Sequence, residues 1–160
     1  MATQKIHPIF KNLKIDPSLT PRIIEAICHP CYTTDYQSAL KQAAANNMRI
    51  LAAFTGYEWC PYSKALSLEV FNTCDFGMWT VSKDLTLLYI DLAAAPWKSP
   101  APLEQQELLT KYQVTGFPTV IGLNANGSER GRVAGYSAGT GDKTWMQLFE
   151  NAAKLNVSEP

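Results

Sequence analysis

The sequence predicts an α/β domain with a central mixed sheet of four or five strands and helices on both faces. Two short, nearly continuous apolar runs, residues 49–55 and 85–92, are separated by helical stretches, which is the order of a parallel strand pair joined by a crossover. A third run, residues 117–123, is followed by the turn signal Asn124-Ala125-Asn126-Gly127 and by residues 129–134. This order indicates an antiparallel hairpin that completes the sheet.

Charge and hydropathy narrow the classes of function. The chain has 160 residues, which suits one domain, and its 14 lysines and arginines balance 14 aspartates and glutamates. No run of like charge is present, so we expect no nucleic-acid partner. No apolar run approaches the about 20 residues that span a bilayer, so we expect no membrane span.

The chain divides into an extension and a domain. Residues 1–34 are expected to form an N-terminal extension, because prolines recur there and only residues 21–27 could form a helical turn. Residues 35–157 are expected to form the domain. Residues 93–102 hold three prolines and are expected to form a long surface loop.

Helices are predicted where apolar residues recur at helical spacing between capping and breaking residues. In chain order, the first begins after Thr34 or Asp35 and ends at Asn46-Asn47, the next three cover residues 62–71, 76–82 and 103–112, and the last begins at a cap on Asp142.

Cys60 is the main candidate for a reactive residue. It follows the strand run 49–55, and Pro61 suits the first position of the next helix, so Cys60 is expected at a helix N-terminus. The partial positive charge and unpaired N–H groups there stabilise a thiolate, which is the nucleophilic form of cysteine. A buried, unreactive cysteine that only fills space is the alternative.

The residues around Cys60 indicate a single-thiol site. The motif reads Cys60-Pro61-Tyr62-Ser63, with serine where a second cysteine would complete Cys-x-x-Cys. The Ser63 hydroxyl can hydrogen-bond a thiolate, but it cannot resolve a mixed disulfide by intramolecular attack. Trp59 and Tyr62 would flank the sulfur with aromatic surface for a polypeptide.

Three segments together resemble the thioredoxin superfamily: Phe54-Thr55-Gly56-x-x-Trp-Cys-x-x-x-Lys64, Leu68-Glu69-Val70-Phe71, and the stretch from Tyr112 to Thr119. Within it, the chain is similar to periplasmic thioredoxin disulfide isomerases of the chlamydial type over about residues 35–155. The resemblance implies a thioredoxin fold. It also implies that Pro118 follows a cis bond against Cys60 and that Phe117, Pro118 and Thr119 hold substrate as an added strand.

Two positions depart from the thioredoxin pattern. Ala53 stands where thioredoxins proper carry a buried acidic residue, and Ser63 stands where they carry the second cysteine. A Cys-Pro-x-Ser motif also resembles the anterior gradient proteins, although that likeness is confined mainly to the motif. An introduced serine at position 63 is a further alternative, because this substitution traps mixed disulfides.

The leading functional hypothesis is a thiol-disulfide oxidoreductase or isomerase-like protein. Cys60 would form a mixed disulfide with a protein substrate, and an external thiol, from glutathione or a partner reductase, would release it. A non-catalytic peptide-binding or chaperone-like module, and a serine variant of a dithiol enzyme, are the alternatives. No cofactor is expected. The family resemblance favours a periplasmic or other extracytoplasmic location if a leader was removed, and a chain complete as given would be cytoplasmic.

The other cysteines allow several interpretations. Cys28-His29-Pro30-Cys31 is a Cys-x-x-Cys motif, but no strand precedes it. It is a candidate accessory redox pair, as a disulfide or as free thiols. A zinc site would need two more ligands and His7 is the only other histidine, so no metal is predicted. Cys74 is expected to be a packing residue.

Overall fold

The computed structural model describes Ser18 and residues 32–157. The predicted extension over residues 1–34 therefore lies almost wholly outside the described residues. So do its predicted helical turn and the Cys28–Cys31 pair. At the end of this segment the Tyr32 ring packs against Phe71 and Tyr89, and Thr33 forms an isolated parallel bridge with Leu88.

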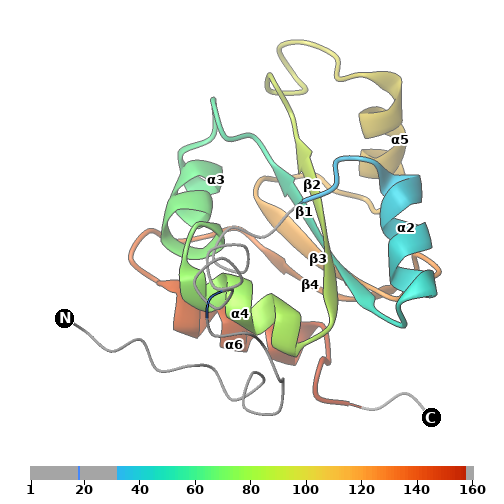
Figure 1. Ribbon diagram of the computed structural model, residues 1–160. Helices are drawn as coiled ribbons and strands as arrows, with labels where there is room; N and C mark the ends of the chain where they lie inside the picture. The colour runs from blue at the N-terminus through green and yellow to red at the C-terminus, as the bar shows by residue number, and fades with distance from the viewer. Residues whose placement is uncertain (1–17, 19–31, 158–160) are drawn as a thin grey trace.

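A four-stranded mixed sheet forms the middle layer, as the sequence predicts (Figure 1). Its spatial order is β2-β1-β3-β4; β1 pairs with β2 in parallel, whereas β1 with β3 and β3 with β4 are antiparallel. The strands are β1 (Arg49–Thr55), β2 (Leu85–Asp91), β3 (Thr119–Leu123) and β4 (Glu129–Ala134). The strand β3 begins two residues later than expected, because Phe117 and Pro118 form a bend.

Helices cover both faces of this sheet (Figure 1), with α3, α4 and α6 on one face and α2 and α5 on the other. They are α2 (Tyr36–Ala45), α3 (Pro61–Leu66), the π-helical turn η2 (Ser67–Phe71), α4 (Cys74–Ser82), α5 (Leu103–Lys111) and α6 (Asp142–Ala152).

Several helix boundaries differ from the predictions, among them the start of α4, which lies two residues earlier than expected. The helix expected over residues 62–71 changes from α-helical to π-helical at Ser67, a change that apolar spacing does not reveal. Asp142 is the first residue of α6 rather than its cap; the cap position belongs to Gly141, and the Asp142 carboxylate accepts from the Lys143 N–H.

Each face of the sheet has its own apolar core, because side chains of a strand point alternately to the two faces. Leu51 and Ala53 of β1 pack with the aromatic residues of α4 and α6, whereas Ile50, Ala52 and Phe54 pack with α2 and α5. All five of these side chains are fully buried. The central strand β1 is thereby held rigidly from both sides at the point where it leads to Cys60.

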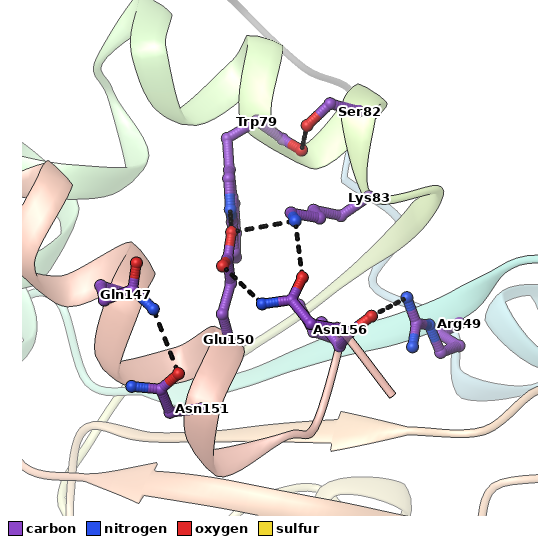
Figure 2. A network of polar contacts seen from close by, with 9 residues as sticks. Arg49, Trp79, Ser82, Lys83, Gln147, Glu150, Asn151 and Asn156 are labelled. Carbon is purple, nitrogen blue, oxygen red and sulfur yellow. Dashed lines mark hydrogen bonds and ion pairs between the residues drawn. The ribbon is translucent and has the colours of Figure 1, made fainter. Parts of the chain in front are cut away.

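A polar network lies near Arg49, the first residue of β1 (Figure 2). The Glu150 carboxylate accepts from Trp79 Nε1 at 2.6 Å and from Asn156 Nδ2 at 3.2 Å, and it pairs with Lys83 Nζ at 3.2 Å. Burial raises the pKa of Glu150, but these hydrogen bonds and the Lys83 charge together hold the pKa below its ordinary value. The network ties α4, α6 and the chain after α6 together.

Candidate active site around Cys60

Cys60 occupies the cap position of α3, directly after the loop that leaves β1. Its N–H donates to the Gly56 carbonyl at 2.7 Å, and its carbonyl accepts from the Lys64 N–H at 3.0 Å. The thiol is free, and 8% of the residue is exposed. The turn thus places Cys60 at the start of a helix, as the sequence predicts.

The Cys60 sulfur faces the segment before β3. Its Sγ donates to the carbonyl oxygen of Phe117 at 3.5 Å. The next peptide bond, Phe117–Pro118, is cis, which is the form that the resemblance implied. The Pro118 carbonyl in turn accepts from the Gly135 N–H at 2.7 Å, and Thr119 is buried. Of the residues expected to bind substrate, Phe117 therefore contacts the sulfur, and Pro118 and Thr119 follow it directly in the chain.

Ser63 is fully buried one turn along α3. Its hydroxyl oxygen accepts from the Gly56 N–H at 3.1 Å, so the side chain holds the loop before Cys60. No hydrogen bond joins Ser63 to Cys60 in the described part of the chain. In this state the serine stabilises the backbone of the site, and its hydroxyl proton is available for a second partner.

Asp91, at the end of β2, also holds the loop. Its Oδ1 accepts from Thr55 Oγ1 at 2.9 Å and from the Tyr57 N–H at 2.8 Å. Sequence reasoning did not single out Asp91. A signal was available, because neighbouring parallel strands end at the same edge of a sheet and Asp91 is an acidic residue at the end of one of them. The position expected for an acidic residue holds Ala53, which is fully buried in the core.

An aromatic wall stands on one side of the sulfur. The Trp59 indole N–H donates to the Leu92 carbonyl at 2.8 Å, and the ring makes edge-to-face contacts with Trp97 and Phe117, each with centroids 5.4 Å apart. Trp97 comes from the loop over residues 93–102 and is 72% exposed. The sequence predicted Trp59 and Phe117 for this site but not Trp97, because no local pattern joins a loop residue to a motif almost 40 positions earlier.

A groove of about 450 Å³ lies between the start of α3, the bend before β3 and the segment after β4. The sequence identified Tyr62, which is 61% exposed, and Phe117 as parts of it. No side chain of the groove is charged; the remaining lining residues are Val133, Ala134, Gly135, Tyr136, Ser137, Thr140, Trp145 and Leu148. Pro61 is exposed at the helix start beside Tyr62.

Cys74 is disulfide-bonded, so its interpretation as a packing residue was wrong. Its bonding partner lies outside the described residues, as do Cys28 and Cys31. A lone cysteine at a helix start gives no sequence signal for its partner. Within residues 32–157 and at Ser18, no group of three or more potential ligands could hold a metal ion, and no helix is long and apolar enough to cross a bilayer.

Comparisons with known proteins agree with this fold. Residues 36–148 match a family described as a thioredoxin-like domain. The disulfide bond reductase DsbH of Chlamydia pneumoniae is 28% identical over 124 residues, which cover 75% of this chain and 71% of the relative.

Solved structures show the same fold. A structure of a DsbH oxidoreductase superposes with a TM-score of 0.64 at 22% identity, over 91% of this chain and 94% of the other. A thioredoxin from Thermus thermophilus superposes with a TM-score of 0.56 at 21% identity, over 72% of this chain and 82% of that protein.

Proposed function

Because this chain belongs to the thioredoxin-like domain family, we propose that it exchanges thiols and disulfides on polypeptide substrates with Cys60 as its single nucleophile. The main observation that supports this proposal is the free Cys60 thiol at the start of α3, whose sulfur lies 3.5 Å from the Phe117 carbonyl oxygen. A buried serine, Ser63, takes the place of a second cysteine. The similarity to a protein named as a disulfide bond reductase supports this class of reaction.

The proposed first step is attack of the Cys60 thiolate on a substrate disulfide. One substrate sulfur becomes joined to Cys60 in a mixed disulfide, and the other leaves as a thiolate. We expect the N–H groups at the start of α3 to stabilise the attacking thiolate and the Ser63 hydroxyl to donate its proton toward it. The Trp59 ring and the uncharged groove, which Tyr62 and Phe117 line, hold the polypeptide, while the buried Pro118 and Thr119 continue the chain from Phe117 into β3.

Release then needs a thiol from another molecule. An external thiolate such as glutathione attacks the Cys60 sulfur, and the substrate sulfur leaves as a thiolate. The resulting mixed disulfide between Cys60 and glutathione is then attacked by a second glutathione, which forms oxidised glutathione and restores the Cys60 thiolate. Alternatively, another cysteine of the substrate attacks the substrate sulfur of the mixed disulfide. A different substrate disulfide then forms and Cys60 leaves as a thiolate, with no net electron transfer. A single thiol is suited to both outcomes, whereas net dithiol oxidation needs a second cysteine.

The test is to follow adducts by intact-protein mass spectrometry with a peptide disulfide at pH about 7. We expect the unmodified chain to accumulate one peptide adduct at Cys60, which disappears when reduced glutathione is added. A Cys60→Ser variant forms none. Binding of peptide without any adduct would favour the non-catalytic module.

Ser63→Cys provides the complementary test. A cysteine there should release the peptide without glutathione and leave a disulfide between positions 60 and 63. It should also confer reduction of insulin disulfides in the presence of dithiothreitol. If the adduct persists in this variant, the two side chains do not face each other and the site assignment is wrong.

A further inference from the structure

The segment after β4, residues 135–141, forms one wall of the groove beside Cys60, and we call it the groove loop. It belongs to no helix or strand, and most of it is exposed. Gly135, Gly139 and Gly141 have φ values of 82°, 88° and 81°, a backbone region that glycine adopts readily. Such a chain has many accessible conformations, so its observed shape depends on the few hydrogen bonds that hold it.

Two side chains, those of Glu69 and Tyr136, supply three of these bonds. Glu69 Oε1 accepts from the Gly139 N–H at 2.6 Å and from the Tyr136 hydroxyl at 3.1 Å. The Tyr136 oxygen accepts from the Gly141 N–H at 3.0 Å. Tyr136 itself is buried and Glu69 is half-buried, so both groups are partly shielded from competing water. Together they fix the groove loop at three positions.

The bonds connect the groove loop with the helix that carries the nucleophile. Glu69 lies in η2, which continues α3 without a break, and Cys60 caps α3. A π-helical turn accommodates an extra residue relative to an α-helix, so side chains beyond Ser67 project in directions that a continuous α-helix would not give. At its other end the groove loop bonds to the site through the Gly135 N–H and the Pro118 carbonyl.

We propose that Glu69 and Tyr136 are positioning residues for polypeptide substrates, since they hold the groove loop in the conformation that receives the chain next to Cys60. The proposal rests on the exchange reaction proposed above and extends it to residues outside the motif. Glu69 directs its negative charge to the groove loop, and the groove is lined by uncharged residues. Loss of these bonds should therefore weaken polypeptide binding and leave the reactivity of the sulfur unchanged.

Two probes separate these effects. The first is a short peptide whose one cysteine is joined to thionitrobenzoate; the Cys60 thiolate attacks the peptide sulfur, and thionitrobenzoate leaves as a coloured thiolate. The second is dithiobis(nitrobenzoate), which releases the same coloured thiolate but has no polypeptide to dock. Stopped-flow absorbance as a function of probe concentration yields the half-saturating concentration and the limiting rate for the peptide.

Tyr136→Phe removes the hydroxyl and Glu69→Ala removes the carboxylate. Each variant removes two hydrogen bonds, so for both we expect the half-saturating peptide concentration to rise at least about fivefold, the change that corresponds to one lost hydrogen bond. The limiting rate and the reaction with dithiobis(nitrobenzoate) should stay unchanged. Glu69→Gln keeps an accepting oxygen, so it should recover part of the loss.

Matched controls remove similar groups elsewhere. Tyr36→Phe removes a hydroxyl that bonds Tyr112 on the opposite face of the sheet, and Glu107→Gln neutralises an exposed carboxylate of α5. Both should react with the peptide as the unmodified chain does. Hydrogen exchange supplies a direct readout, because the Gly139 and Gly141 amides should exchange faster in the groove-loop variants only.

An unchanged half-saturating peptide concentration in Tyr136→Phe and Glu69→Ala would overturn the proposal. An equal decrease of the reaction rate with both probes, in variants that keep their melting temperature, would also overturn it. If Glu69→Ala does not fold, the half-saturating peptide concentration of Glu69→Gln and the exchange rates of the Gly139 and Gly141 amides test the proposal in its place. Failure of the exchange reaction itself is distinguishable, because then the unmodified chain would not react with dithiobis(nitrobenzoate).

Discussion

A methyl group at Gly56 should displace the aromatic wall of the site. A Cβ built on Gly56 would overlap the six-membered part of the Trp59 indole and would lie 2.7 Å from its Nε1. The ring cannot move aside without cost, because it is bonded to the Leu92 carbonyl and contacts Trp97 and Phe117. Gly56→Ala should therefore expel the indole from its position.

The cost follows from the contacts that Trp59 would lose. The indole hydrogen bond contributes about 1 kcal/mol, and each of the two edge-to-face contacts contributes about 0.5–1.5 kcal/mol. Replacement of glycine by alanine offsets about 0.4–1 kcal/mol of this, since it restricts the unfolded chain. We expect Gly56→Ala to lower the free energy of unfolding by about 1 to 3.5 kcal/mol.

Urea unfolding followed by circular dichroism measures this difference. Gly116→Ala is the matched control, because it also lies beside the site, has no positive φ, and a Cβ there meets nothing within 4 Å. The control should change stability by less than about 0.5 kcal/mol. Equal stability of Gly56→Ala and Gly116→Ala, with unchanged tryptophan fluorescence, would refute the assignment of Trp59 to this position.

Three further predictions concern the rest of the domain. Because the pKa of Glu150 is lowered in the folded state, its contribution to stability is present above the ordinary glutamate pKa and is lost as the pH falls through the lowered value. Glu150→Gln should therefore flatten the decline of the urea midpoint between about pH 6 and about pH 3. Gly131→Ala would place a Cβ against the Ala152 carbonyl and should cost about 3 kcal/mol in the same unfolding assay. In the unfolded chain, iodoacetamide should label Cys60 without prior reduction and Cys74 only after reduction, and labelling of both without reductant would contradict the disulfide.

The sheet was predictable because its signals are local. A strand buried on both faces must be apolar throughout, and β1 was predicted with its observed bounds. The position of Cys60 at a helix start followed from Pro61 directly after it. The family resemblance added Phe117 and Pro118 to the site. Periodicity could not have placed them near Cys60, because Phe117 lies 57 residues further along the chain.

The parts of the site that were missed depend on tertiary contacts. Trp97, Asp91 and Tyr136 lie in segments whose distance from Cys60 is set by how the sheet and loops pack, and a single sequence does not contain that distance. Glu69 was quoted only as part of a motif, because the π-helical turn that accompanies its contact with the groove loop leaves no trace in apolar spacing. The Cys74 disulfide was missed because a single sequence does not contain the distance between two cysteines.

The separation between Cys60 and Phe117 also has a consequence during synthesis. At about 5–20 residues per second, the 57 residues that follow Cys60 up to and including Phe117 emerge from a ribosome over about 3 to 11 s. For that time the nascent chain presents a thiol whose covering carbonyl has not yet been made. Any cysteine or oxidant that meets the nascent chain in this interval finds the sulfur unprotected, so the compartment in which translation or export ends decides whether the thiol reaches the finished domain intact.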